Sequence, residues 1–301
     1  MDLGSNTLRL LVAQVEDGRW QALDRGLATP RLGAGLEPGG RLSPEARRQA
    51  RRQAGRFARR ARELGAERVV LAATQACRVA ADGPEFVARL GRDLGLDRAR
   101  VLSGREEARL SRLGVLSRLQ GPVAGAWLAD IGGGSTELVD LAGGEGEAQS
   151  LALGAVSLTR RHLAGDPPGP EELAALDGAV DQALASVANR PVRRLVATAG
   201  TAASLAALLL GHREYRPDEL DNLVVGRAEL EDQFRRLAGM DLDTRRRLLA
   251  LEPRRAEIIL AGLAILRGLV RLWGLEEFTV MDAGLLEGIL LDEVDKQARG
   301  E

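Results

Sequence analysis

The sequence predicts an α/β protein built from two related domains, and three observations lead to this prediction. An aspartate followed by a Gly-rich turn and an apolar strand occurs twice. Buried strands alternate with amphipathic helices along both halves. The chain has 301 residues, of which 45% are hydrophobic, and this length exceeds what one ordinary hydrophobic core requires.

The two Gly-rich copies align without a gap. The chain begins "MDLGSNTLRLLV", and residues 129–140 read "ADIGGGSTELVD", so that Asp2 matches Asp130 and Gly4 matches Gly132. Each copy predicts a β-hairpin whose glycines supply the turn conformation. Successive backbone N–H groups in such a turn can bind an anion, and the leading carboxylate can hold a hydrated cation. A plain hairpin turn would explain either copy alone, but the duplication favours the anion site.

The first half continues with a loop, a long helix and a buried strand. Gly and Pro residues up to Gly40 mark the loop, and Ser43-Pro44 predicts the N-cap and first residue of the helix. This helix is rich in arginine; we favour a solvated face over a phosphate-gathering face. A strand over 69–73 then leads into a polar turn that carries Thr74 and Arg78. Ligands gather at the carboxyl ends of such strands, so Arg78 either pairs with a phosphate or is an ordinary surface arginine.

A helix over 84–95, a short strand near 99–104 and a helix from about Arg105 complete this half. Glu106 and Glu107 lie in the first turn of the last helix, where carboxylates also stabilise a helix electrostatically. Turn residues place the boundary between the halves at 116–122. We expect one domain to comprise residues 1–118 together with a C-terminal helix at about 284–301, and the second domain to comprise 119–283.

The second half begins with the second Gly-rich hairpin and strands around 149–158. A helix from Pro170 follows, and residues 192–211 read as a strand, a Gly-Thr turn and a helix that opens at about Thr201. Gly200 and Thr201 at this helix N-terminus form a third, individually weak, anion-friendly site. Helices over 227–273, a strand, a polar turn at 282–284 and a final helix end the chain.

Composition limits the partners and the compartment. The net charge of −1 and the pI near 6.3 provide no bulk field that would recruit nucleic acid or an anionic membrane. The single Cys77 allows no internal disulfide and suits a reducing cytosol. No run of about 20 uninterrupted apolar residues occurs. We expect a cytoplasmic protein, and its oligomeric state stays open, with a homodimer as one candidate.

The acidic-Gly hairpin in each half and the strand–Gly-Thr–helix resemble the actin, hexokinase and sugar-kinase superfamily, whose two related actin-like domains clamp a phosphate chain across an interdomain cleft. The resemblance is closer to the exopolyphosphatase and guanosine pentaphosphate phosphohydrolase family, in its short two-domain form. It covers nearly the whole chain, and the segments that carry it occur in the family's order. They are "DLGSNTLRLLV", "RLGAGL", "ATQACR", "SGREEARL", "DIGGGSTELV", "ATAGTAASLAAL" and "DAGLLEGIL".

The resemblance implies a role for each matching residue. Glu107 of "SGREEARL" matches the catalytic base, with Glu106 as the runner-up. Asp2 and Asp130 match metal-linked positions for Mg²⁺ or Mn²⁺. The implied phosphate-binding residues are Ser5, Asn6, Thr7, Arg9, Arg78, Gly132, Gly133, Gly134, Ser135, Thr136, Gly200 and Thr201.

The sequence also departs from the family pattern. The family usually has several strand residues before the first aspartate, an Arg where this chain has Leu286, and an Asp and Pro-Gly in the segment that here contains Glu257. The implied reaction is hydrolysis of the terminal phosphoanhydride of polyphosphate. Guanosine pentaphosphate hydrolysis and non-catalytic binding of polyphosphate or alarmone remain alternatives. A sugar or acetate kinase fits the "SGREEAR" and "ATQACR" contexts poorly.

Overall fold

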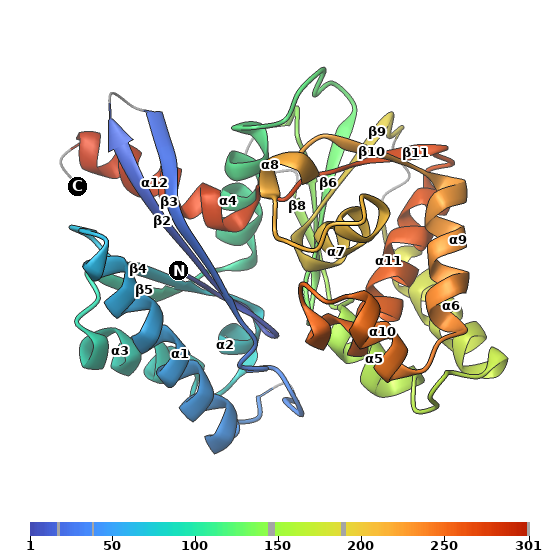
Figure 1. Cartoon of the computed structure of the whole chain (residues 1–301), viewed down its shortest axis with the longest axis horizontal. Coiled ribbons are helices and arrows are strands. Elements are labelled where there is room, and N and C mark those ends of the chain that lie inside the picture. Colours follow the sequence, from blue (N-terminus) through green and yellow to red (C-terminus); the bar gives the residue numbers. More distant parts are fainter. Residues whose placement is uncertain (17–18, 38, 144–147, 188–190, 300–301) are drawn as a thin grey trace. The chain divides into compact units, whose positions relative to one another are not determined.

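The computed structural model describes residues 1–16, 19–37, 39–143, 148–187 and 191–299. The described residues form two compact units, each with its own sheet and helices (Figure 1). Unit 1 comprises Met1–Gly114 and Leu285–Glu301, and unit 2 comprises Val115–Gly284. The α/β fold class is confirmed. The domain limits drawn from the sequence, and a cleft between the domains, stay predictions.

The sheet of unit 1 has the strand order β3-β2-β1-β4-β5. β1, β2 and β3 form an antiparallel meander, whereas β1, β4 and β5 run parallel. The strands are β1 (Asp2–Leu3), β2 (Leu8–Glu16), β3 (Arg19–Ala28), β4 (Val70–Ala73) and β5 (Arg98–Val101).

The sheet of unit 2 repeats this topology. Its order β8-β7-β6-β9-β11 again joins an antiparallel meander to parallel strands, and β10 adds an antiparallel edge beside β11. The two related domains predicted from the repeated hairpin are therefore confirmed. The strands are β6 (Ala126–Ile131), β7 (Thr136–Asp140), β8 (Ala148–Leu151), β9 (Arg194–Thr198), β10 (Leu223–Gly226) and β11 (Glu277–Val280).

Helices cover both sheets. In unit 1, α1 and α3 lie on one side of the sheet and α12 lies on the other (Figure 1). The helices of unit 1 are α1 (Pro44–Glu63), α2 (Gln75–Val79), α3 (Gly83–Leu94), α4 (Gly104–Leu116), which continues into unit 2, and α12 (Leu285–Arg299). Those of unit 2 are α5 (Ala155–His162), α6 (Pro170–Leu184), α7 (Ala199–Leu209), α8 (Pro217–Leu220), α9 (Arg227–Ala238), α10 (Leu242–Leu248), the 3₁₀ helix η1 (Pro253–Glu257) and α11 (Ile259–Leu272).

Helix α1 shows how the sequence places the core of unit 1. Ser43 caps it, because its side chain accepts a hydrogen bond from the N–H of Ala46 at 3.1 Å. Its buried face is mostly alanine, which lets the helix approach the sheet closely, and Phe57 packs against Gly26 of β3. Most of its arginines are exposed. The structure therefore agrees with the sequence-based preference for a solvent-exposed arginine face on this helix.

The core of unit 2 surrounds α11. This helix is apolar on nearly all sides and is buried along most of its length, as expected for a helix enclosed by other elements. It packs against α5, α6 and α9. Among the described residues, no helix is both long enough and apolar enough to cross a lipid bilayer.

The structure differs from the sequence expectations at two segments. Residues 155–158 were expected in a strand but begin helix α5, because the N–H groups of residues 155–157 meet carbonyls of the second hairpin. Arg78 was expected in a turn but lies in the short helix α2.

Leu286, at the position where the family usually carries Arg, is buried in α12.

Candidate active site

The first Gly-rich turn connects β1 to β2. The N–H of Gly4 donates to the carbonyl of Thr7 at 2.8 Å and closes the turn. Asn6, within the turn, is 8% exposed, and its amide nitrogen Nδ2 makes no hydrogen bond to any residue that the structure describes. A buried donor without an acceptor costs about 1–3 kcal/mol. The turn therefore contains a donor that a bound anion would satisfy.

Two other segments hold this turn in place. The N–H of Gly33 donates to the carbonyl of Ser5 at 2.7 Å, and the hydroxyl of Ser5 donates to Oε1 of Gln75 in α2 at 2.8 Å. A methyl group at Gly33 would lie 3.1 Å from Cβ of Ser5. The "RLGAGL" segment thus approaches the turn more closely than most side chains would allow.

Asp2 and Arg9 are cross-strand neighbours in the β1–β2 ladder. Nε of Arg9 lies 3.6 Å from Oδ2 of the buried Asp2. The sequence suggested a metal role for Asp2 and an anion role for Arg9, and the structure brings the two residues together as an ion pair. A cation at Asp2 would therefore compete with the Arg9 guanidinium for the same carboxylate.

Glu107 lies in the first turn of α4 and is 6% exposed. Its Oε2 accepts a hydrogen bond from Nη1 of Arg78 at 2.8 Å, and the same nitrogen donates to the carbonyl of Leu102 at 2.9 Å. A buried carboxylate needs such a charged partner to offset the cost of its desolvation. Arg78 therefore both compensates and orients Glu107.

Helix α2 connects the first turn to Glu107. Oε1 of Gln75 accepts a hydrogen bond from the hydroxyl of Ser5. Arg78 lies three positions further along α2 and donates a hydrogen bond to Glu107. Residues three apart share one face of a helix. Within unit 1, one helical turn of α2 therefore brings the first hairpin and the buried carboxylate to the same end of the sheet.

Glu106 has a different environment from Glu107. Its Oε2 accepts from the N–H and the hydroxyl of Ser103 at 2.9 Å and 2.8 Å, and its Oε1 accepts from Nη1 of Arg100 at 2.6 Å. Ser103 in turn accepts from the N–H of Glu106 at 3.2 Å, which completes a capping box. Burial raises the pKa of Glu106, but the bonds from Ser103 and the charge of Arg100 outweigh this effect and hold its pKa below the usual value. Glu106 is thus the N3 residue of the capping box that starts α4 at Ser103.

The second Gly-rich turn closes in the same way as the first. The N–H of Gly132 donates to the carbonyl of Ser135 at 2.9 Å. The carbonyls of Gly132 and Gly133 accept from the N–H groups of Ala155 and Val156, at the start of α5, at 3.0 Å and 2.8 Å. In a trans peptide the N–H points opposite to the C=O. The N–H groups of Gly133 and Gly134 therefore point away from α5.

In the second turn, one side chain already makes a hydrogen bond within the protein and another is buried. Thr136 donates its hydroxyl to the carbonyl of Leu153 at 2.6 Å, and Ser135 is buried. A methyl group at Gly154 would lie 2.4 Å from the carbonyl carbon of Gly134. The backbone N–H groups of this turn, more than the Thr136 hydroxyl, are thus suited to meet a phosphate.

Three parallel strands of unit 2 bring polar groups to one edge of the sheet. Asp130 of β6 pairs in register with Thr198 of β9, and α7 begins directly afterwards. Thr198 donates its hydroxyl to the carbonyl of Ala283, and Asp282 follows β11. The carboxyl ends of parallel strands are where ligands bind in α/β sheets. The second hairpin and the α7 N-terminus therefore share this edge.

Gly200 and Thr201, in the first turn of α7, are close to residues that the sequence did not single out. A methyl group at Gly200 would lie 1.9 Å from Nη2 of Arg255, a buried guanidinium that donates two hydrogen bonds from Nη2 to Glu252. Thr201 is 0% exposed, and its hydroxyl packs against Gly262. Its hydroxyl makes no hydrogen bond to any residue that the structure describes, and its phosphate contact stays a prediction.

Two features of this edge were missed from the sequence. Arg255 lies far from Gly200 in the chain, so no local pattern could predict their contact. Ala199 adopts a left-handed φ of 69°, which costs a non-glycine residue about 1–2 kcal/mol. Such strained residues cluster at functional sites.

The carboxylates present suit a hydrated cation. Within the described part of the chain, no group of three or more His, Cys, Asp or Glu side chains could enclose a metal ion. Mg²⁺ usually keeps several waters and takes only one or two carboxylates. Asp2 and Asp130, which lead the two hairpins, each supply one carboxylate of the kind that such an ion takes, and their metal role stays a prediction.

Duplicated sheets of this order, each with a Gly-rich hairpin that leaves the central strand, define an actin-like α/β protein. The chain belongs to the Ppx/GppA phosphatase family, whose model matches residues 11–297. The resemblance seen in the sequence is therefore confirmed.

Relatives match over almost the full chain. Exopolyphosphatase 2 of Mycobacterium tuberculosis is 33% identical over 310 residues, covering 97% of this chain and 96% of the relative. Exopolyphosphatase 1 of Mycobacterium leprae is 33% identical over 315 residues, covering 100% of this chain and 90% of the relative. The crystal structure of the Aquifex aeolicus member of the Ppx/GppA family has a TM-score of 0.80 at 31% identity and covers 98% of this chain and 96% of that chain.

Proposed function

We propose that this protein is an exopolyphosphatase, which hydrolyses the terminal phosphoanhydride of inorganic polyphosphate and releases orthophosphate. The observation that carries the proposal is the connection through α2, which joins the first Gly-rich turn at Ser5 to the buried carboxylate of Glu107. The full-length similarity to proteins named exopolyphosphatase supports the same reaction.

Several of the predicted site residues would take part in this reaction. Phosphoryl transfer requires in-line positioning and stabilisation of charge on the equatorial oxygens. The N–H groups of both Gly-rich turns and the amide of Asn6 would bind the phosphate oxygens. Glu107 would orient the attacking water and accept its proton, a contribution of about 10²- to 10⁴-fold. The new P–O bond forms from that water as the bridging P–O bond breaks, and the shortened chain leaves with the bridging oxygen.

Arg78 has two tasks in the proposal. Both of its described bonds use Nη1, and a guanidinium carries five N–H donors. It would orient Glu107 through Nη1 and contact the phosphate chain through its other donors. Asp2 and Asp130 would hold Mg²⁺ or Mn²⁺. When bound, such an ion neutralises negative charge on the phosphate oxygens.

A phosphate-release assay tests the proposal. Purified protein is incubated with long polyphosphate, short polyphosphate or guanosine pentaphosphate in the presence of Mg²⁺, and free phosphate is measured. We expect release from polyphosphate. Release from guanosine pentaphosphate alone would support the alternative activity, and tight polyphosphate binding without release would indicate a non-catalytic binding protein.

The substitution Glu107→Gln tests the base assignment. It preserves the shape of the side chain but removes the basic oxygen, so we expect phosphate release to fall by at least about 10²-fold. Binding of polyphosphate should persist, and isothermal titration measures it. A mutant that still releases phosphate at the wild-type rate would show that another group is the base.

Compartment and assembly complete the proposal. We propose a cytoplasmic enzyme, on the basis of its single, buried Cys77. A homodimer is the assembly we would test first. Size-exclusion chromatography with light scattering measures the molar mass directly.

A further inference from the structure

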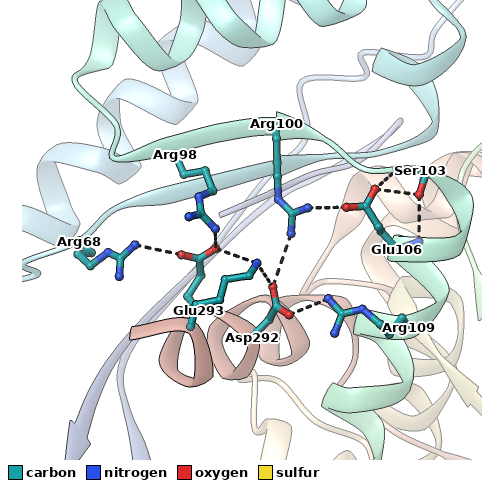
Figure 2. Close-up of polar contacts among 9 residues, drawn as sticks. Arg68, Arg98, Arg100, Ser103, Glu106, Arg109, Asp292 and Glu293 are labelled. Atoms are coloured by element: carbon teal, nitrogen blue, oxygen red, sulfur yellow. Dashed lines mark hydrogen bonds and ion pairs between the residues drawn. The ribbon is translucent and has the colours of Figure 1, made fainter. Parts of the chain in front are cut away.

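A cluster of charged side chains joins α12 to α4 and to the sheet of unit 1 (Figure 2). Asp292 of α12 is 8% exposed and lies at its centre. Its Oδ1 accepts from Nη2 of Arg109 in α4 at 2.6 Å, and its Oδ2 accepts from Nζ of Lys296 at 2.5 Å. Nη2 of Arg100 in β5 lies 3.6 Å from the same Oδ2. One carboxylate of α12 is therefore shared by three cations from three elements.

Arg100 extends this cluster to the cap of α4. While its Nη2 faces Asp292, its Nη1 donates to Glu106 at 2.6 Å, and Figure 2 shows the guanidinium between the two carboxylates. Glu106 completes the capping box with Ser103. The carbonyl of Ser103 accepts the N–H of Glu107 at 2.9 Å. The backbone of Glu107 is therefore tied to the residue that the cluster fixes.

The backbones of α4 and α12 also interlock. A methyl group at Gly288 of α12 would lie 1.8 Å from the carbonyl oxygen of Leu110. Leu102, Leu110, Leu285 and Ile289 form a small core between the same segments. The polar cluster and this contact together leave α4 little freedom to slide or rotate against α12.

We infer that Asp292, Arg100 and Glu106 are positioning residues for the reaction, and that they hold the first turn of α4 so that Glu107 meets the attacking water. The inference rests on the proposed function, in which Glu107 is the base. Neither Asp292 nor Glu106 touches substrate in this scheme. A displacement of about 1 Å at a reacting group can cost about 10²-fold in rate, so fixing α4 matters even though the cluster lies outside the hairpins.

The chain offers a matched control in Glu293, the next residue of α12. Glu293 also pairs with two arginines, Arg98 at 3.0 Å and Arg68 at 3.4 Å, and its Oε1 lies 3.9 Å from Nζ of Lys296. Neither arginine belongs to α4 (Figure 2). Loss of Glu293 should thus weaken the docking of α12 to the sheet without releasing the cap of α4.

Steady-state phosphate release from polyphosphate tests the inference, at a temperature well below the unfolding midpoint of every variant. For Asp292→Asn and Glu106→Ala we expect kcat to fall about tenfold while KM stays within about twofold. Glu106→Gln should recover to within about threefold of wild type, because glutamine also completes a capping box. Glu293→Gln should keep the wild-type kcat.

Several results would overturn the inference. Equal loss of kcat in Glu293→Gln and Asp292→Asn, or a wild-type kcat in Asp292→Asn, would reduce the cluster to a stabilising contact. If Asp292→Asn does not fold, a wild-type kcat in Glu106→Ala leads to the same conclusion. If Glu106→Gln is as inactive as Glu107→Gln, then Glu106 takes part in the chemistry and does not merely position α4.

The same variants separate this inference from the proposed function. If wild-type protein releases phosphate and Glu107→Gln does not, the proposed function stands whatever the cluster variants show. If Glu107→Gln keeps full activity, the base assignment fails, and the inference fails with it.

Discussion

At the scale of single residues, Gly200 shows how a missing side chain shapes the edge of the second sheet. Arg255 occupies the space that a methyl group would need, and Glu252 holds it there. We expect Gly200→Ala to destabilise unit 2 by about 1–3 kcal/mol, as overpacking of a filled site does. Phosphate release should also fall, because either the Arg255 guanidinium or the first turn of α7 has to move. Thermal unfolding and the release assay measure the two effects.

Gly178 is the control for this prediction. It is exposed on α6, and a methyl group there would meet nothing within 4 Å. Alanine is the better helix former by about 0.8–1.0 kcal/mol, so Gly178→Ala should raise the unfolding midpoint and leave activity unchanged. If both alanine variants unfolded at the same temperature, the packing argument at Gly200 would be wrong.

At the scale of elements, the backbones of α4 and α12 are in close contact, with no room for a side chain between them at Gly288. At Gly288 the added methyl group would meet the Leu110 carbonyl, a backbone atom, so one helix must shift. We expect Gly288→Ala to destabilise unit 1 by about 1–3 kcal/mol or more. Its kcat should fall as well, because α4 carries Glu107. Calorimetric melting measures the first effect, and an unchanged melting profile would contradict the interlock.

The elements also show what the sequence could and could not predict. The capping signal at Ser43 correctly predicted the start of α1, because a cap is a local interaction. Residues 155–158 were wrongly expected in a strand, since their helix starts on carbonyls of a distant hairpin. The Ser103–Glu106 spacing is a readable capping box and could have assigned Glu106 as a cap. The contact of Arg255 with Gly200 is tertiary and has no local signal.

At the scale of the whole molecule, the duplication was the most predictable feature. Two short turns matched in register, and the strands that follow each turn form sheets of the same order. A repeated turn predicts a repeated fold because the central strand and its hairpin are one local unit. For α12, which follows β11 but packs in unit 1, the sequence analysis predicted a C-terminal helix at about 284–301 in the first domain, but it predicted no role for that helix. Its charged cluster with α4 depends on side-chain directions that spacing does not reveal.

Acid stability is the property in which these charges act together. Burial raises the pKa of Asp292, but hydrogen bonds from Lys296 and Arg109 outweigh it, so its pKa in the folded protein lies below the usual value. Glu106 shifts in the same direction. A carboxylate with a lowered folded pKa stabilises the protein fully above its unfolded pKa of about 4, and this contribution is lost as the pH falls through the folded value.

We therefore expect the unfolding midpoint to stay nearly level from about pH 7 to pH 5 and to drop below about pH 4. Asp292→Asn removes one of the titrating groups, so its midpoint should be lower at neutral pH and should approach that of wild type in acid. Thermal melts at a series of pH values, followed by circular dichroism, measure both curves. If the gap between wild type and Asp292→Asn were the same at pH 7 and pH 3, the stabilisation would come from packing of the side chain and not from its charge.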